Sequence, residues 1–395
     1  MTIAEACRQQ TLGSRIRTLI VGAGVAGLSL AALLRRAGER PALIERAPSL
    51  GEGGYNLGLY PLGARILYGL GLMPRYLEIS TPFRRYQMGN GHGELVHDFD
   101  LGGSLARYGP FQGIRRRELL DLLHSDAVAS PVQFQATLVS LKNNGPEVEA
   151  VFSDGSSGAF DLVVGADGMH SETRKQLLEA KEFHYWDSGW GCWVAWLAAG
   201  LLPPATAIEY WGAGRLVGIY PVKDGLGAVL AGPKAAMRSE GREAFAAHVG
   251  EKFGMMTGPV AAVVDAVRNA PSPFFWDLHD CRCQRWSQGR VVLLGDAATG
   301  FLPTAGVGAS MAMLAAATLA DELARSGPAE VELALRFYEQ RHRPRAEAAQ
   351  DNSRKLARMM FVESTPLAWG RDQLIKFYTL DQALKEIVAI MESGA

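Results

Sequence analysis

Three glycines near the start of the chain have the spacing of a turn that binds the phosphates of a dinucleotide. They follow the apolar run 16–21 and open an Ala/Leu-rich stretch that Gly38 ends. In such a GxGxxG pattern the first glycine permits a tight turn, the second lets the backbone approach a pyrophosphate, and the third allows close helix packing. Free N–H groups at the start of the following helix bind the anion. The residues of this predicted turn are Gly22, Gly24, Val25, Ala26 and Gly27.

An acidic residue follows at the distance that this pattern requires. The next apolar run, 41–44, predicts a second strand, and Glu45 comes directly after it. A carboxylate at this place accepts hydrogen bonds from the ribose hydroxyls of a bound dinucleotide. The alternative is a solvated charge at the end of a strand, but the preceding glycines favour the ribose interpretation.

Two later turns also follow apolar runs and carry an aspartate. Asp167 and Gly168 come after the run 161–165, and Asp296 comes after the run 290–294. Open α/β sheets bind ligands at the carboxyl ends of their strands, so three such turns indicate one ligand-binding edge. The first of these two turns is also compatible with an ordinary Asp-Gly turn.

Together these motifs resemble those of the class A flavoprotein monooxygenases of the para-hydroxybenzoate hydroxylase fold, over nearly the whole chain. They stand here as Gly22-x-Gly24-x-x-Gly27 with Glu45 and Arg46, as Asp167-Gly168-x-x-Ser171-x-x-Arg174, and as Gly295-Asp296 running to Pro303 and Gly308. The segment 53–59, the loop 303–308 and a long C-terminal helix look most similar to the branch of tetracycline-inactivating monooxygenases. The resemblance implies non-covalently bound FAD, NADPH or NADH as co-substrate, and O₂.

The reaction that the resemblance implies is hydroxylation of an aromatic or polycyclic small molecule through a flavin C4a-hydroperoxide, with the cofactor carrying the chemistry. A fold does not fix a function, so a halogenase, an epoxidase or a reductase on the same scaffold is the enzymatic alternative. The non-enzymatic alternative is a flavin-binding sensor.

The resemblance also assigns residues to the FAD. Glu45 and Arg46 belong to the ribose end, and Arg116, which precedes a Leu-Leu helix, would lie beside the phosphates or the ribose. Asp167 and Gly168 would face both the FAD and the pyridine nucleotide, and Asp296 would bind the ribityl chain. Backbone N–H groups of 306–309 suit a flavin carbonyl that becomes anionic. The loop that carries them contributes Pro303, Gly306, Val307, Gly308 and Ala309.

The chain departs from the family at two places. Thr299 stands where many relatives have a histidine, and the segment 49–54 lacks an arginine that often precedes the part of the chain crossing the flavin. The family's usual contacts for hydride delivery are therefore in doubt here.

The elements that position these residues alternate between strand and helix. A strand, a tight turn, a helix and a second strand over 16–44 form a right-handed crossover, which builds a parallel sheet. Short β-forming segments occupy 84–98 and 185–232, where Gly and Pro turns separate runs rich in Trp and Tyr. Helical periodicity fills 331–360 and 367–391.

We therefore predict an α/β fold, with a Rossmann-type FAD-binding domain of the para-hydroxybenzoate hydroxylase and glutathione reductase type and an interleaved antiparallel substrate sheet. The chain leaves the FAD-binding domain twice and returns to it. The predicted FAD-binding domain comprises residues 15–82, 108–182 and 280–330, the substrate-binding domain comprises 83–107 and 183–279, and C-terminal helices over 331–395 bridge the two.

The candidate substrate-binding residues are Trp193, Trp211 and Tyr220, which fall on predicted strands of the middle block. Alternation along a strand places Trp211 and Glu209 on one face and Tyr210 on the other. A cleft lined by aromatic side chains suits a flat aromatic substrate. The alternative for each tryptophan is the protein core, and we assign no catalytic acid or base.

Composition limits the remaining classes of function. A formal net charge of −1 gives no field that would attract nucleic acid or an anionic membrane. The four cysteines lack the spacing of a metal site and predict reduced thiols in a cytoplasmic protein without a metal. No apolar core of signal-peptide length precedes residue 15, and the apolar run 18–34 is broken by glycines and too short to span a membrane comfortably. The oligomeric state stays open.

Overall fold

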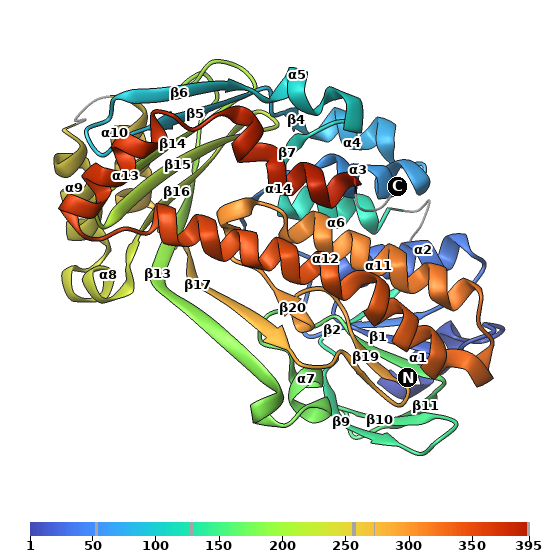
Figure 1. The fold of residues 1–395 in the computed structure, drawn as a ribbon. Helices are drawn as coiled ribbons and strands as arrows, with labels where there is room; N and C mark the ends of the chain where they lie inside the picture. Colours follow the sequence, from blue (N-terminus) through green and yellow to red (C-terminus); the bar gives the residue numbers. More distant parts are fainter. Residues whose placement is uncertain (52–53, 126–129, 255–257, 272, 393–395) are drawn as a thin grey trace.

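The computed structural model describes residues 1–51, 54–125, 130–254, 258–271 and 273–392. Two large β-sheets lie at opposite ends of the molecule, and long helices run between them (Figure 1). One sheet has six strands in the order β18-β19-β12-β1-β2-β8, and the other has eight in the order β20-β17-β13-β16-β15-β14-β5-β6. Two three-stranded sheets, β11-β10-β9 and β3-β7-β4, complete the β-structure of the described residues.

The six-stranded sheet is parallel except at one edge. β1 pairs in parallel with β12 and β2, β12 with β19, and β2 with β8, whereas β18 pairs antiparallel with β19. All four residues of β1 are buried, as expected for a parallel strand covered on both faces. The strands are β1 (Thr18–Val21), β2 (Ala42–Glu45), β8 (Val132–Phe134), β12 (Leu162–Gly165), β18 (Ser287–Gln288) and β19 (Val291–Leu293).

Helices cover this sheet and extend from it. α2 packs against α11, which in turn packs against α3 and the 30-residue helix α12. Asp280 is fully buried on β17 and forms an ion pair with Arg354 of α12 at 2.6 Å. This ion pair fixes the long helix to the eight-stranded sheet, which corresponds to the predicted substrate sheet. The helices around the sheet are α2 (Val25–Arg36), α3 (Pro61–Gly69), α4 (Met73–Ile79), α6 (Arg116–Leu123), α7 (Glu172–Leu177), α11 (Gly308–Ala324) and α12 (Val331–Met360).

The eight-stranded sheet is antiparallel except for the parallel pair β14 and β5. Long β13 and β17 run together from this sheet toward α7 near the other end of the molecule (Figure 1). α10 packs against β13, β15 and β16. The elements are β5 (Arg85–Gly89), β6 (Leu95–Asp100), β13 (Phe183–Leu197), β14 (Thr206–Gly212), β15 (Arg215–Val222), β16 (Gly225–Pro233), β17 (Phe274–Cys283), β20 (Thr299–Gly300), α8 (Lys234–Glu240), α9 (Arg242–Phe253) and α10 (Gly258–Asn269).

The small elements join these parts. β7 lies between β3 and β4 and packs against β15 of the eight-stranded sheet, and α1 packs against β11 and β2. These elements are α1 (Ile3–Gln10), β3 (Asn56–Leu59), β4 (Thr81–Pro82), α5 (Leu101–Leu105), β7 (Gln112–Arg115), β9 (Leu138–Asn143), β10 (Val148–Phe152) and β11 (Ser157–Phe160).

One predicted helix is in fact two. Instead of a single helix over 367–391, the chain forms α13 (Thr365–Ile375) and α14 (Leu380–Glu392). The break has a local cause, because Thr379 and Gln382 cap the start of α14 reciprocally: the Thr379 N–H donates to Gln382 Oε1 at 3.0 Å, and the Gln382 N–H donates to Thr379 Oγ1 at 3.3 Å.

A turn separates the neighbouring strands β8 and β9. Gln135 lies between them with a φ of 55°, a left-handed conformation that no strand accommodates.

The mixed α/β fold with a Rossmann-type parallel sheet agrees with the prediction. The eight-stranded sheet takes strands from both segments assigned to the substrate domain, together with β20 and the end of β17. The boundaries of the domains stay a prediction. In the part of the chain that the structure describes, no helix has both the length and the apolar character needed to cross a membrane.

Candidate functional site

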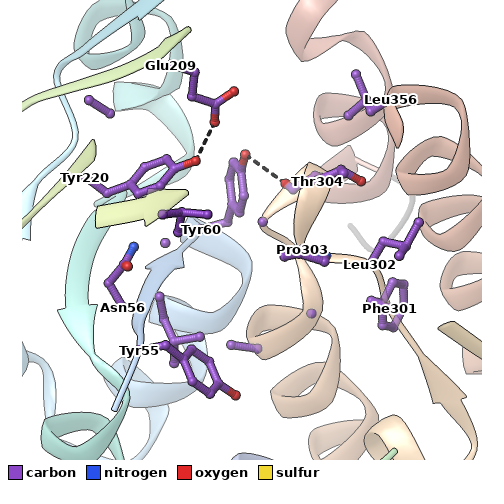
Figure 2. Close-up of a pocket in the computed structure, with 18 of the residues that line it drawn as sticks. Tyr55, Asn56, Tyr60, Glu209, Tyr220, Phe301, Leu302, Pro303, Thr304 and Leu356 are labelled. Atoms are coloured by element: carbon purple, nitrogen blue, oxygen red, sulfur yellow. Dashed lines mark hydrogen bonds between the residues drawn. The ribbon is translucent and has the colours of Figure 1, made fainter. Parts of the chain in front are cut away.

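A single cavity of about 410 Å³ connects the edge of the parallel sheet with the inner face of the substrate sheet. In Figure 2 the loop from Phe301 to Thr304 lies on one side of this cavity, Glu209 and Tyr220 lie on the other, and Tyr60 lies between them. Leu380, Leu384 and Ile387 of α14, among other residues, also line the cavity. The predicted site residues that line it are Gly24, Val25, Ala26, Arg116, Gly168, Asp296, Pro303, Gly306, Gly308, Ala309, Trp211 and Tyr220.

The first glycine turn fits a phosphate because of where side chains are missing. Gly22 has a φ of 106°, and a Cβ there would lie 2.5 Å from the carbonyl oxygen of Ala166. A Cβ on Gly27 would lie 1.9 Å from the carbonyl oxygen of Gly22. A Cβ on Gly24, by contrast, meets no atom within 4 Å, and this glycine lines the cavity. The outer two glycines serve packing, and the middle one leaves room for a ligand.

The start of α2 faces this room with its backbone donors. No side chain caps the helix at Gly24, and the bond from the Leu28 N–H to the Gly24 carbonyl begins its hydrogen bonding. The N–H groups of the first turn therefore have no partner within the helix. Val25 and Ala26 line the cavity here, so the turn offers free donors and a partial positive charge to an anion.

Glu45 and Arg46 lie outside the cavity lining. The Glu45 carboxylate accepts hydrogen bonds from the Ala23 N–H at 2.8 Å and from the Ala47 N–H at 2.9 Å. The first of these bonds holds the backbone of the glycine turn. Arg46 is exposed. Each carboxylate oxygen keeps a further acceptor position, and contact of Glu45 with a ribose stays a prediction.

The second turn, which follows β12, is held by Asp167. The buried Arg174 links it to the third turn, which follows β19. Asp167 accepts hydrogen bonds from the Ser171 hydroxyl and from both the N–H and the hydroxyl of Thr173, the N–H at 2.9 Å. Arg174 is fully buried and donates to the carbonyls of Met169 and Ala297, the latter at 2.9 Å. Asp167 thus points into its own turn, while Gly168 lines the cavity.

Asp296 is the charged group of the third turn, in the short 3-10 helix Gly295–Ala297. Its carboxylate is enclosed by the cavity walls, and this burial raises its pKa to about 6, although Arg116 and Arg174 act in the opposite direction. The Arg116 guanidinium lies 5.6 Å from the centre of the Tyr55 ring. An enclosed carboxylate with a raised pKa needs hydrogen-bond donors, and the hydroxyls of a ribityl chain are donors of this kind.

The loop before α11 completes the cofactor end. Gly306 has a φ of 63°, which lets the chain turn into the helix, and no side chain caps the helix at Val307. Gly308 and Ala309 of its first turn line the cavity, while the Val307 side chain is buried. The N–H groups at this helix start suit developing negative charge on a ligand.

A polar cluster stands in the otherwise apolar far end of the cavity. Glu209 is 7% exposed and accepts hydrogen bonds from the Tyr86 hydroxyl at 2.8 Å, the Trp211 Nε1–H at 2.8 Å and the Tyr220 hydroxyl at 2.7 Å. We call these four residues the acceptor cluster. Burial and the neighbouring Glu209 carboxylate raise the pKa values of Tyr86 and Tyr220 well above their ordinary value, so both hydroxyls keep their protons.

One predicted pocket residue lies elsewhere. Trp193 does not line the cavity but packs between Phe245 and Phe275, on the face of β13 turned toward the helices α8–α10. Its neighbours Cys192 and Val194 line the cavity instead, because side chains alternate along a strand. Tyr86 was not predicted from the sequence. Glu209 was predicted to share a strand face with Trp211, but no function was assigned to it.

The fold is that of the para-hydroxybenzoate hydroxylase type, whose members bind a flavin, and comparisons with known proteins agree. Residues 15–353 match the model of the family described as FAD binding domain. This match spans most of the chain, so the chain belongs to that family and its cofactor is FAD.

Relatives of known activity place the chain among the FAD-dependent monooxygenases. It is 32% identical over 373 residues to a 3-amino-4-hydroxybenzoate 2-monooxygenase of Streptomyces cremeus, with 91% of this chain and 92% of the relative covered. It is 29% identical over 373 residues to an aurachin C monooxygenase/isomerase of Stigmatella aurantiaca, with 93% and 95% covered. The chain is therefore an enzyme of this class, and the halogenase, epoxidase, reductase and sensor alternatives are not favoured.

Solved structures share the fold. HpxO of Klebsiella pneumoniae, solved with FAD and uric acid, matches with a TM-score of 0.84 at 24% identity, over 95% of this chain and 97% of that chain. The tetracycline destructase Tet(55) matches with a TM-score of 0.72 at 21% identity, over 96% of both chains.

The glycine turn generates a first prediction. The substitution Gly24→Ala should weaken FAD binding about tenfold or more, because the added methyl group occupies the space in front of the helix donors. The melting temperature of the FAD-free protein should stay unchanged. Gly27→Ala is the matched control, since its methyl group meets the Gly22 carbonyl and should lower that melting temperature. FAD titration and thermal unfolding measure both effects, and normal FAD affinity of Gly24→Ala would contradict the assignment.

A second prediction follows from the raised pKa of Asp296. Its folded-state pKa of about 6 lies above the ordinary value of 3.8, so protonation favours the folded FAD-free protein. This stabilisation is complete below about pH 4 and is lost as the pH rises through about 6. Asp296→Asn should therefore melt at a higher temperature than the unsubstituted protein at about pH 8, and the difference should shrink at about pH 4. A difference that does not depend on pH would show that Asp296 does not titrate in this range.

Proposed function

We propose that this enzyme hydroxylates a flat aromatic or polycyclic molecule, with FAD held between the three turns and with NADPH or NADH as the reductant. The observation that carries the proposal is that one cavity joins the phosphate-binding turn to a pocket lined by aromatic and apolar side chains. A cofactor bound at one end of such a cavity would meet a substrate bound at the other.

We assign the FAD to residues on all three turns. The N–H groups at Val25 and Ala26 would bind the pyrophosphate, with Arg116 close to it. Asp296 would accept hydrogen bonds from the ribityl hydroxyls, and the donors at the start of α11 would bind the flavin carbonyl at its pyrimidine end. Gly24, Gly168, Pro303, Gly306, Gly308 and Ala309 line the same cavity and would contribute further contacts. Gly22, Gly27, Asp167 and Val307 would shape the turns that carry these contacts, and contact of Glu45 and Arg46 with the ribose stays a prediction.

Bound FAD supplies the redox chemistry and the activation of O₂. The chain's own residues exclude water and orient the substrate. Met88, Leu216 and Leu302 contribute apolar wall at the substrate end, where bulk water would compete with oxygen transfer. The N–H groups of 308 and 309 at the start of α11 would stabilise negative charge on a carbonyl of the bound flavin. We assign no side chain as catalytic acid or base.

The substrate class is supported by the relatives and by the shape of the pocket. The named relatives act on an aminohydroxybenzoate and on aurachin C, and a structural neighbour binds uric acid. Trp211 and Tyr220 contribute flat or ring surfaces to the pocket wall, which suit a planar ring system. The chain has no second GxGxxG pattern after a strand, so we propose that the pyridine nucleotide binds without a domain of its own.

The direct test is the visible spectrum of the purified holoenzyme, recorded before and after anaerobic addition of NADPH or NADH. Flavin absorbance should bleach faster when a suitable aromatic phenol is present than when it is absent, and admission of O₂ should then yield hydroxylated product. A flavin that both nucleotides leave oxidised with every phenol would contradict the assignment of the reductant.

A further prediction separates the two faces of the substrate sheet. Trp211→Ala should oxidise NAD(P)H with less hydroxylated product and more H₂O₂, because the enlarged pocket holds the substrate loosely and admits water. Trp193→Ala is the matched control: it removes a side chain of the same size from the opposite face, so it should lower the melting temperature while the ratio of product to oxidised NAD(P)H stays unchanged. If both variants showed the same fall in the ratio of product to oxidised NAD(P)H, the assignment of Trp211 to the substrate pocket would be wrong.

A further inference from the structure

All the polar side-chain hydrogens of the acceptor cluster are donated to one carboxylate, that of Glu209. The hydroxyls of Tyr86 and Tyr220 and the indole N–H of Trp211 each donate to Glu209. A tyrosine hydroxyl has one hydrogen to donate and keeps lone pairs, whereas an indole N–H accepts nothing. The cluster therefore presents lone pairs, and no free hydrogen, to a ligand in the cavity.

The carboxylate itself keeps room for one more donor. Glu209 Oε2 accepts two hydrogen bonds, from Tyr86 and Trp211, whereas Oε1 accepts a single bond, from Tyr220. An ionised carboxylate has about four acceptor positions. Glu209 also lines the cavity, so Oε1 is the place where a buried donor on the substrate would be bound most strongly.

The charges along the cavity favour the same kind of ligand. Among the described residues that line it, Glu209 and Asp296 are acidic and Arg116 is the basic one. Arg116 lies at the cofactor end, where it contacts the Tyr55 ring and reduces the pKa shift of Asp296. A carboxylate on a substrate at the far end would therefore be buried beside Glu209 without a cationic side chain to pair with, which is costly in an apolar pocket.

We propose that the acceptor cluster selects neutral aromatic substrates that offer an N–H or O–H donor, such as an aminophenol or an N–H heterocycle, and rejects aryl carboxylates. This inference rests on the proposed function for the position of the substrate. It separates this enzyme from relatives that are named for a benzoate, although the amino and hydroxyl groups of such a ring would suit the cluster.

The substitution Glu209→Gln should reverse the preference. The amide oxygen of glutamine must take the place of Oε2, because Trp211 Nε1–H can only donate. The amide N–H₂ group then stands in the place of Oε1, where Tyr220 can accept one of its hydrogens and the other faces the cavity. A donor replaces an acceptor, and the negative charge disappears without a change in size.

The test uses holoenzyme and two matched pairs of ligands: 3-amino-4-hydroxybenzamide with 3-amino-4-hydroxybenzoate, and 4-hydroxybenzamide with 4-hydroxybenzoate. Within each pair the rest of the ring is the same, and the amide differs from the acid in being uncharged and in carrying N–H donors. Dissociation constants are measured from the perturbation of the flavin spectrum. In the unsubstituted enzyme each amide should bind about tenfold or more tightly than its acid. In Glu209→Gln the ratio should fall to about one or below, through tighter binding of the acid as well as weaker binding of the amide.

Tyr220→Phe is the second variant, and it keeps the carboxylate while it removes one donor. It should retain the preference for amides, whereas a purely structural role of the cluster would weaken acid and amide equally in both variants. The inference is overturned if either acid binds as tightly as its amide in the unsubstituted enzyme, or if neither amide binds. Hydroxylated product from either pair is scored separately: its absence with the preference intact would count against the proposed function alone, and its presence with the acids preferred would count against this inference alone.

Discussion

The close contact between two backbone turns is the constraint on which the site depends. Gly27 lies against the Gly22 carbonyl, and Gly22 lies against the Ala166 carbonyl. Both contacts are so close that a Cβ atom on either glycine would clash with the carbonyl oxygen. This contact sets α2 on the parallel sheet and brings the turn after β12 beside the turn after β1. Arg174 then connects the second turn to the third through the Ala297 carbonyl. Three segments far apart in the sequence therefore present their ligand-facing groups at one edge.

Two carboxylates in the same cavity show how surroundings divide one type of residue into two roles. Glu209 has three strong donors around it, which compensate for its removal from water. Asp296 has two arginines nearby, yet burial dominates and raises its pKa. The first carboxylate belongs to a network of protein donors that leaves one acceptor position open, and we assign the second to a bound ligand. Both arrangements are consistent with one continuous cavity that holds a cofactor and a substrate at its two ends.

The sequence was sufficient to predict the features that depend on neighbours along the chain. The glycine turn, the strands β1, β2 and β12, and the helix α12 follow from local periodicity and turn chemistry. The acceptor cluster could not be found in this way, because Tyr86 reaches Glu209 only through the parallel pairing of β5 with β14, more than a hundred residues apart. The position of Trp193 depends on which face of β13 the helices cover, and β13 also shifts its register against β17 between Asp187 and Trp190.

The pairing of the parallel sheet also determines the order in which the molecule can be completed. β1 pairs with β12, and β12 pairs with β19, so the sheet that carries the phosphate-binding turn lacks a strand until residue 293 has been synthesised. The hairpins β14–β15 and β15–β16 need only neighbouring residues and can form earlier. During translation β1 can pair early with β2, but β12 and the strand β19 beside it emerge much later, so the sheet behind the phosphate-binding turn is completed late although that turn begins the chain. The eight-stranded sheet likewise becomes complete only after β17 and β20 have emerged.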